Sequence, residues 1–257
     1  MADLPLFNHA LNEPTAFRPE DLVDAVREQR GKGKGSIPPL GVLEFDGDLI
    51  DKLIARGEVD RCEDWPCFHT DMWLWPKDEP RCGIVARTIG GPYTVLIAEQ
   101  MAVCGMKAVV GLASAGRIGR ALPLPGIVVA DEAVRDEGTS LHYLTESETV
   151  RGDLELAEAL SVAMKAVELP VRQGLVWTTD APYRETHSQI EHWASRDVLA
   201  VEMQAASLFA FGRARGVATG LVAHVTNAID HDGEPFHKGP DEVDIAMLAA
   251  ISQIGSW

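Results

Sequence analysis

Short apolar runs alternate with segments of helical apolar spacing along most of this chain. The apolar runs predict strands over residues 40–45, 83–88, 107–113, 127–134, 175–179, 198–202 and 218–227. Apolar residues three or four positions apart predict helices over residues 19–30, 48–56, 92–104, 154–167, 188–195, 203–215 and 241–254. This alternation predicts a single α/β domain in which helices flank a mixed, largely parallel central sheet.

The first 36 residues do not share this alternation. Residues 1–18 have no regular pattern, Pro19 opens the first helix, and the Gly-Lys-Gly-Lys-Gly-Ser segment at 31–36 is typical of a flexible connector. That connector lacks the spacing of a phosphate-binding loop, and no predicted strand precedes it. We therefore expect an N-terminal arm, helix and linker over residues 1–36 and the α/β domain over residues 37–257.

The overall charge argues against a nucleic-acid partner. The chain has 39 acidic and 23 basic residues and a formal net charge of −16, whereas a groove for a phosphate backbone needs clustered Lys and Arg. There is no run of about 18 apolar residues, so we expect no membrane partner. The first residues lack the basic-then-apolar order of a signal peptide, which favours a cytoplasmic location.

The four cysteines fit reduced thiols in the cytoplasm. Cys62, Cys67 and His69 lie close together in the sequence, as some zinc ligands do, but no second half of a zinc motif follows them. We therefore predict no metal site.

Small and polar residues stand where three of the predicted strands end. The apolar runs that begin at residues 111, 177 and 201 each change to such residues within a few positions. In an open α/β sheet, ligands bind at the carboxyl ends of the strands. These three strand ends therefore predict one pocket for a small polar ligand with a flat ring.

Four segments resemble motifs of the nucleoside phosphorylase superfamily, and of the uridine phosphorylases in particular. They are Thr-Ile-Gly-Gly-Pro at 88–92, Ser-Ala-Gly at 114–116, Ala-Val-Arg-Asp-Glu-Gly-Thr-Ser at 133–140 and Glu-Met-Gln-Ala-Ala at 202–206. They follow the family's order, and the similarity covers roughly residues 39–227. The resemblance implies the family's fold and a reaction that cleaves the N-glycosidic bond of a nucleoside.

The resemblance also implies a catalytic set. Met203 holds the position of a Met that packs against the sugar, and Gln204 replaces a Glu that accepts from the ribose hydroxyls. Gln204 keeps an acceptor but brings no negative charge to the developing oxocarbenium ion. Ser114 would face the nucleophile, and Asn227 stands where uridine phosphorylases also have Asn. The expected catalytic residues are Ser114, Gln204 and Asn227.

The remaining site residues are expected to hold the substrate or phosphate. Tyr183 would stack on the base, and Arg184 would bond an exocyclic oxygen. The expected substrate-binding residues are Gly90, Gly91, Gly116, Thr179, Tyr183, Arg184, Glu202, Met203 and His69. Arg87 and Ser114 are the candidates for a contact with phosphate.

The arginines with which uridine phosphorylases hold phosphate are missing from this chain. Leu49 and Gly111 stand at the positions of two of them, no Arg lies near His69 for the third, and segment 44–48 carries three acidic residues. We therefore favour hydrolysis, and the alternative is a phosphate-dependent, uridine-like phosphorylase. A non-catalytic nucleoside-binding protein is an alternative of another class, because Gln204 lacks the family's charge.

The partners expected from the resemblance are a small-molecule nucleoside and further copies of this chain. Members of the family are dimers or hexamers, so we expect a homo-oligomer. No cofactor is predicted, and phosphate is the one candidate co-substrate.

Overall fold

The computed structural model describes residues 4–35, 37–229 and 239–254. The strands are β1 (Leu40–Glu44), β2 (Asp60–Arg61), β3 (Trp73–Trp75), β4 (Cys82–Ala86), β5 (Ala108–Arg117), β6 (Gly126–Asp136), β7 (Thr149–Arg151), β8 (Val171–Thr179), β9 (Ala200–Glu202) and β10 (Ala218–Ala228). The helices are α1 (Pro19–Arg30), α2 (Asp48–Arg56), α3 (Gly91–Val103), α4 (Leu154–Met164), α5 (His187–Ala194), α6 (Ala205–Arg215) and α7 (Asp241–Ser252). Single 3₁₀ turns are η1 (Pro5–Phe7), η2 (Thr139–His142) and η3 (Pro182–Arg184).

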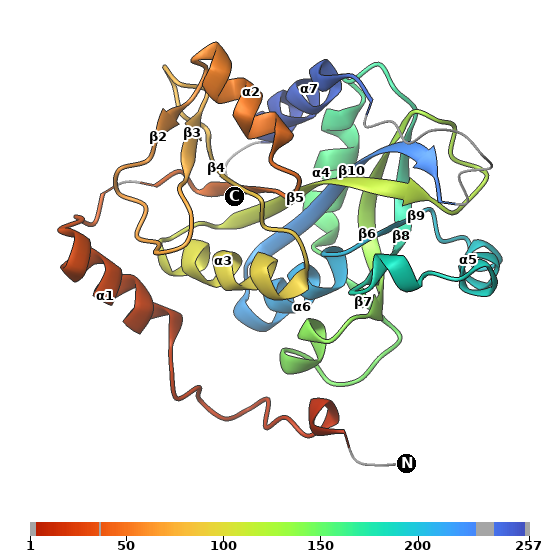
Figure 1. Ribbon diagram of the computed structural model, residues 1–257, viewed down its shortest axis with the longest axis horizontal. Helices are drawn as coiled ribbons and strands as arrows, with labels where there is room; N and C mark the ends of the chain where they lie inside the picture. Colours follow the sequence, from red (N-terminus) through yellow and green to blue (C-terminus); the bar gives the residue numbers. More distant parts are fainter. Residues whose placement is uncertain (1–3, 36, 230–238, 255–257) are drawn as a thin grey trace.

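All of these strands belong to one sheet, which is partly closed on itself. The order is β10-β6-β8-β9-β5-β1-β4-β3-β2, β7 pairs with β6, and β10 also pairs with β5. Strands β5, β10, β6, β8 and β9 therefore form a ring, and β1, β4, β3 and β2 extend from it (Figure 1). The β1–β4, β1–β5, β5–β10, β6–β8 and β8–β9 pairs are parallel. The predicted mixed, largely parallel α/β sheet is confirmed.

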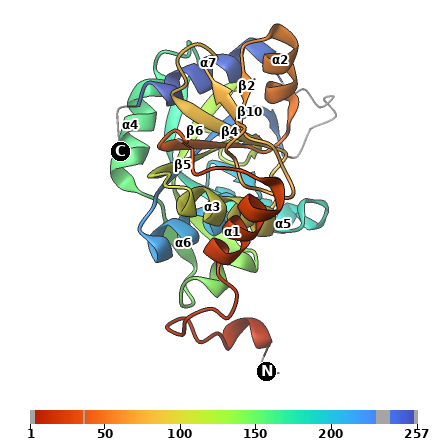
Figure 2. The ribbon, with the colours of Figure 1, turned by 90° about the vertical axis from the view of Figure 1, so that its left-hand side faces the viewer.

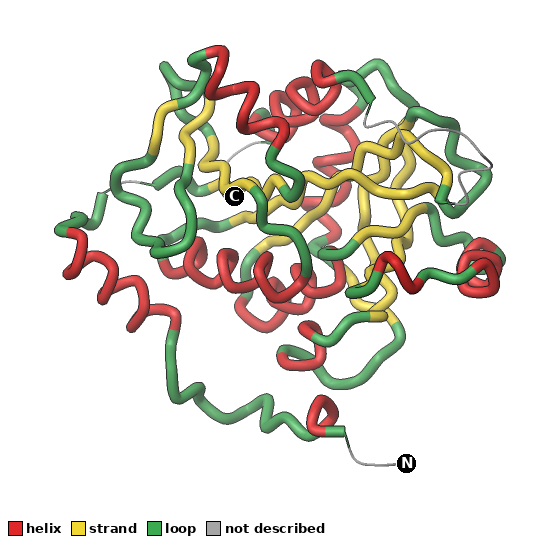
Figure 3. Tube along the Cα trace, in the orientation of Figure 1, coloured by secondary structure: helices red, strands yellow, loops and turns green. Residues whose placement is uncertain are grey.

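Helices cover both faces of this sheet (Figure 3). Along β1, Leu43 packs in a core shared with α3 and α6, whereas Val42 packs in a core shared with α2, α4 and α7. Successive residues of a strand point to opposite faces, so a strand buried on both sides needs apolar residues at nearly every position. This is why β1, β4 and β5 begin as unbroken apolar runs.

The N-terminal segment lies along the outside of this body. Helix α1 has the predicted bounds, contacts α3, and ends at Gly31, whose φ of 62° suits a glycine cap. Residues before it run away from the sheet to η1 (Figures 1 and 2). Just after η1, His9 stacks on His142 of η2 with ring centroids 3.9 Å apart.

The structure differs from the sequence prediction most where a strand continues past its expected end. Strand β5 runs to Arg117, so segment 114–116 is not a turn after the strand but part of it. The cause is a distant partner, because Gly116 and Arg117 pair with Val201 and Ala200 of β9. Strands β2, β3 and β7 were not predicted, since they are too short for a recognisable alternation.

Candidate active site

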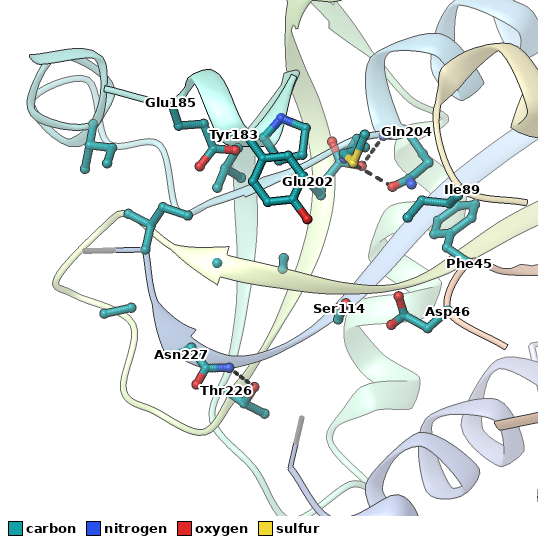
Figure 4. A pocket seen from close by; sticks show the side chains of 18 of the residues that line it. Phe45, Asp46, Ile89, Ser114, Tyr183, Glu185, Glu202, Gln204, Thr226 and Asn227 are labelled. Atoms are coloured by element: carbon teal, nitrogen blue, oxygen red, sulfur yellow. Dashed lines mark hydrogen bonds between the residues drawn. The ribbon is translucent and has the colours of Figure 1, made fainter. Parts of the chain in front are cut away.

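A cavity of about 690 Å³ opens at the carboxyl ends of β5, β8, β9 and β10; we call it the main cavity. Of the residues expected in the site, those that line it are Ser114, Gly116, Tyr183, Glu202, Met203, Gln204 and Asn227. They come from four separate parts of the sequence and meet in one place (Figure 4). The predicted convergence of strand ends on one pocket is thereby met for β5 and β9, the loop after β8 contributes Tyr183, and β10 adds Asn227.

Met203 and Gln204 are held by the junction between β9 and α6. The Glu202 carboxylate accepts hydrogen bonds from the backbone N–H groups of Gln204 (2.6 Å) and Ala205 (2.8 Å). It also accepts from the Thr178 hydroxyl at 2.5 Å. Because the acidic side chain receives the free N–H groups at the start of α6, it fixes where the helix begins.

Glu202 is therefore occupied by protein donors, although sequence reasoning placed it among the substrate-binding residues. It is 5% exposed, and burial raises the pKa of its carboxyl to about 7 in spite of the three donors. The geometry gives Glu202 a positioning role beneath its neighbours Met203 and Gln204.

Gln204 is 4% exposed and reaches the main cavity from the first residue before α6. Its side-chain carbonyl accepts from the Met203 backbone N–H at 3.1 Å. An amide carbonyl has a second lone pair, so this contact leaves it able to accept from a ligand hydroxyl.

Ser114 and Asp46 lie side by side at the floor of the main cavity (Figure 4). Asp46 follows β1, and Ser114 is in the neighbouring strand β5. Asn227, on β10, lines the cavity nearby and donates from its side-chain amide to the Thr226 hydroxyl at 2.8 Å. A nucleophile bound here would meet a hydroxyl group and a carboxylate.

Other expected site residues lie outside the main cavity. Arg87 makes an ion pair with Asp51 at 2.5 Å, and its side chain is 57% exposed. His69 is exposed in the loop between β2 and β3. Thr179 is buried and accepts from the Ala181 N–H at 3.3 Å.

Three of the expected residues lie off the lining, and two nearby residues of the same segments line the cavity instead. Arg184 is exposed and does not line the cavity, whereas Glu185 does. Gly90 and Gly91 also lie off the lining, and the preceding Ile89 faces the cavity instead. Motif position could not reveal these shifts, because they depend on the turn that each segment makes.

Sequence reasoning also missed Phe45, His187 and Ile190, which are among the other residues that line the cavity. The Phe45 ring packs over Gly111: a side-chain carbon at position 111 would come within 2.8 Å of the ring. Leu49 is 2% exposed and belongs to the core. The two positions at which the resemblance implied phosphate-binding arginines are thus closed by apolar packing.

The charge in the main cavity is negative. Among the described residues that line it, the charged side chains are Asp46, Glu185 and Glu202, and neither Lys nor Arg is present. Burial raises the pKa of the Glu185 carboxyl to about 7. An anionic ligand would therefore meet repulsion from the described part of this chain.

A second, much smaller cavity of about 30 Å³ adjoins the first through Asp46 and Ser114. It is lined by buried Glu44, whose carboxyl pKa burial raises to about 7, and by His224. The ring of His224 is held by Asp244 at 3.1 Å. This volume suits about one water molecule.

Within the described residues, no group of three or more His, Cys, Asp or Glu side chains is arranged to hold a metal ion. Cys62 and Cys67 are buried free thiols. As far as the described chain goes, none of its helices combines the length and apolar content needed to span a membrane.

Comparison with known proteins places these features in a wider group. A family model described as "Phosphorylase superfamily" matches residues 46–255. Guanosine phosphorylase of Halorubrum lacusprofundi is 26% identical over 233 residues, which cover 83% of this chain and 96% of that protein. Uridine phosphorylase of Escherichia coli is 25% identical over 217 residues, which cover 75% of this chain and 86% of that protein.

A similar fold occurs among solved structures. The crystal structure of uridine phosphorylase from Vibrio fischeri ES114 superposes with a TM-score of 0.70 at 19% sequence identity. The superposition covers 87% of this chain and 94% of that one. At this identity the likeness establishes the fold.

Proposed function

We propose that this chain, which belongs to the phosphorylase superfamily, cleaves the N-glycosidic bond of a nucleoside in the main cavity. The family membership confirms the resemblance that the sequence motifs indicated. The observation that carries the proposal is the meeting of Ser114, Met203, Gln204 and Asn227 around one cavity of suitable size for a small ligand.

Each of these residues has a task that its surroundings support. Met203 would pack against the sugar, and Gln204, fixed by the Glu202 network, would bind the ribose hydroxyls. Ser114 would position the nucleophile below the anomeric carbon. Asn227 would hydrogen-bond the departing base. Holding the two reactants in line is the main source of rate enhancement in such a site.

The relatives support phosphate as the nucleophile, whereas the sequence motifs favoured water and hence hydrolysis. The guanosine phosphorylase and the uridine phosphorylase described above match most of this chain. Phosphorolysis therefore stands first among the two reactions. In that case the positive charge for the dianion must come from outside the described lining, for example from a second copy of this chain in a homo-oligomer.

Water is the second candidate, and a specific observation favours it. Among the described residues of the main cavity there is no Lys or Arg, and the Asp46 carboxylate lies beside Ser114. A carboxylate at this place repels phosphate but accepts a proton from an attacking water. Water would then add its oxygen to the anomeric carbon, the bond electrons would leave with the base, and free pentose would result.

Product analysis separates the two reactions. The purified chain is incubated with guanosine, inosine, adenosine and uridine, each with and without phosphate. Phosphorolysis gives pentose 1-phosphate and requires phosphate, whereas hydrolysis gives free pentose at a rate that phosphate does not change. Nucleoside binding without any base release would support the non-catalytic alternative and refute the proposed function.

A further inference from the structure

Glu185 is the one carboxylate of the main cavity that is half-buried and yet unpaired among the described residues. It follows η3 and lines the cavity next to Tyr183. Figure 4 shows its carboxylate beside the Tyr183 ring, at the opposite end of the cavity from Gln204. No hydrogen bond or ion pair from the described chain reaches it, in contrast to Glu202 with its three donors.

Such a carboxylate needs donors from a ligand. Partial burial removes water from it, and this loss alone raises the pKa of Glu185 to about 7. An ionised carboxylate only accepts hydrogen bonds, and its two oxygens suit two neighbouring N–H groups. A ligand that brought oxygen or nitrogen lone pairs to this end of the cavity would add repulsion instead.

The nucleobases differ in how well they meet this demand. Guanine carries a ring N–H and an exocyclic amino group side by side on its Watson–Crick edge, so it offers two adjacent donors. Hypoxanthine keeps the ring N–H alone. Uracil has one N–H between two carbonyl oxygens, and adenine has one amino group beside a ring acceptor. A carboxylate therefore favours guanine over all three.

We propose that Glu185 is the base-recognition residue of this cavity and that the preferred substrate is a guanine nucleoside. The inference rests on the proposed function, and it reverses the sequence expectation at this loop. There, Arg184 was expected to donate to an exocyclic oxygen, as would suit uracil. In the structure Arg184 is exposed and does not line the cavity, whereas its neighbour Glu185, an acceptor, does.

The substitution Glu185→Gln tests the role of Glu185 in base recognition with little change in the shape of the side chain. The amide replaces one acceptor by a donor, so it faces the guanine edge with one mismatched pair. We expect kcat/KM for guanosine to fall roughly ten- to a hundred-fold, with a smaller fall for inosine and none for uridine. Glu191→Gln, which makes the same change at an exposed position on α5, is the matched control and should leave all three unchanged.

The pH dependence gives a readout that a purely structural role would not produce. The other titratable groups lining the cavity are Asp46 after β1, Tyr183 in η3, His187 in α5 and Glu202 in β9. As the pH falls through about 7, Glu185 takes up a proton and loses an acceptor. The guanosine-to-uridine ratio of kcat/KM should fall with it in the native chain and stay level in Glu185→Gln.

The outcomes separate this inference from the proposed function. Cleavage that prefers uridine at about pH 8, or a guanosine-to-uridine ratio that Glu185→Gln leaves unchanged, would overturn the role of Glu185 while leaving nucleoside cleavage intact. Failure to cleave any nucleoside would refute the proposed function instead. Calorimetry then still tests Glu185, because guanosine should bind the native chain about tenfold more tightly than Glu185→Gln, and equal affinity would contradict the inference.

Discussion

Three acidic residues of the main cavity have the same ionisable group but different roles. The role of each depends on the groups around its carboxylate. Glu202 receives two backbone N–H groups and a hydroxyl, so it holds the chain in place. The Glu185 carboxylate receives no hydrogen bond from the described residues and is available to a ligand. Asp46 lies beside Ser114, where a nucleophile would bind. From sequence, Glu202 was expected to bind the substrate and Asp46 belonged to an acidic segment near the expected phosphate site, whereas Glu185 was not singled out.

Gln204 offers a test at this scale, because the motif that it belongs to implies a Glu in its position. Gln204→Glu should raise turnover of ribonucleosides about tenfold, since a charged acceptor stabilises the positive sugar better than a neutral one. The measurement is kcat with a saturating nucleoside. Gln253→Glu, which adds the same charge at an exposed site after α7, should change nothing. Unchanged or lower turnover in a folded Gln204→Glu protein would show that Gln204 serves another substrate.

Residue chemistry was predictable where the backbone follows the motif directly. Met203, Gln204 and Asn227 reach the cavity as expected, because each is at or next to a strand end, and Ser114 reaches it from within β5. Arg87 does not reach the cavity, and its side chain is held by an ion pair with Asp51 of α2. A single sequence carries no information about such a partner until the fold brings the two together.

At the scale of elements, the strands were predicted better than their ends. The buried runs at β1, β4 and the first part of β5 were visible because strands covered on both faces must be apolar throughout. The extension of β5 to Arg117 was not visible in the sequence, because it depends on pairing with β9, more than eighty residues later in the chain. That extension closes the ring of strands and carries Ser114 and Gly116 to the cavity.

The junction of β9 and α6 gives a stability prediction. Glu202→Ala would leave three buried donors without an acceptor, so the free energy of unfolding should fall by about 3 kcal/mol. Urea denaturation followed by circular dichroism measures it. Glu191→Ala on the exposed face of α5 should cost well under 1 kcal/mol. Equal midpoints for the two variants would show that the carboxylate does not hold the start of α6.

For the whole molecule, the acidic composition and the buried carboxyls both lower the stability of the folded chain as the pH rises. The formal net charge is −16, and burial raises the pKa values of Glu44, Glu185 and Glu202 from 4.5 to about 7. In this range the folded chain binds more protons than the unfolded chain, so protonation favours folding. Stability is therefore lost as the pH rises through about 7.

The expected result is a higher urea midpoint at about pH 5.5 than at about pH 8. Glu44→Gln removes one of the three groups and should reduce this difference, because its amide carries no ionisation cost in the core. A midpoint that rises steadily with pH across this range would contradict the assigned directions of the pKa shifts.

Cleavage of nucleosides in the main cavity is tested most directly by measuring the released base by chromatography. The native chain should release free base from at least guanosine. Ser114→Ala should lose most of this rate while keeping its urea midpoint, because Ser114 is exposed to the cavity and supports no part of the core. Glu191→Gln should release base at the native rate. Absence of base release from every nucleoside, or full activity in Ser114→Ala, would contradict the account.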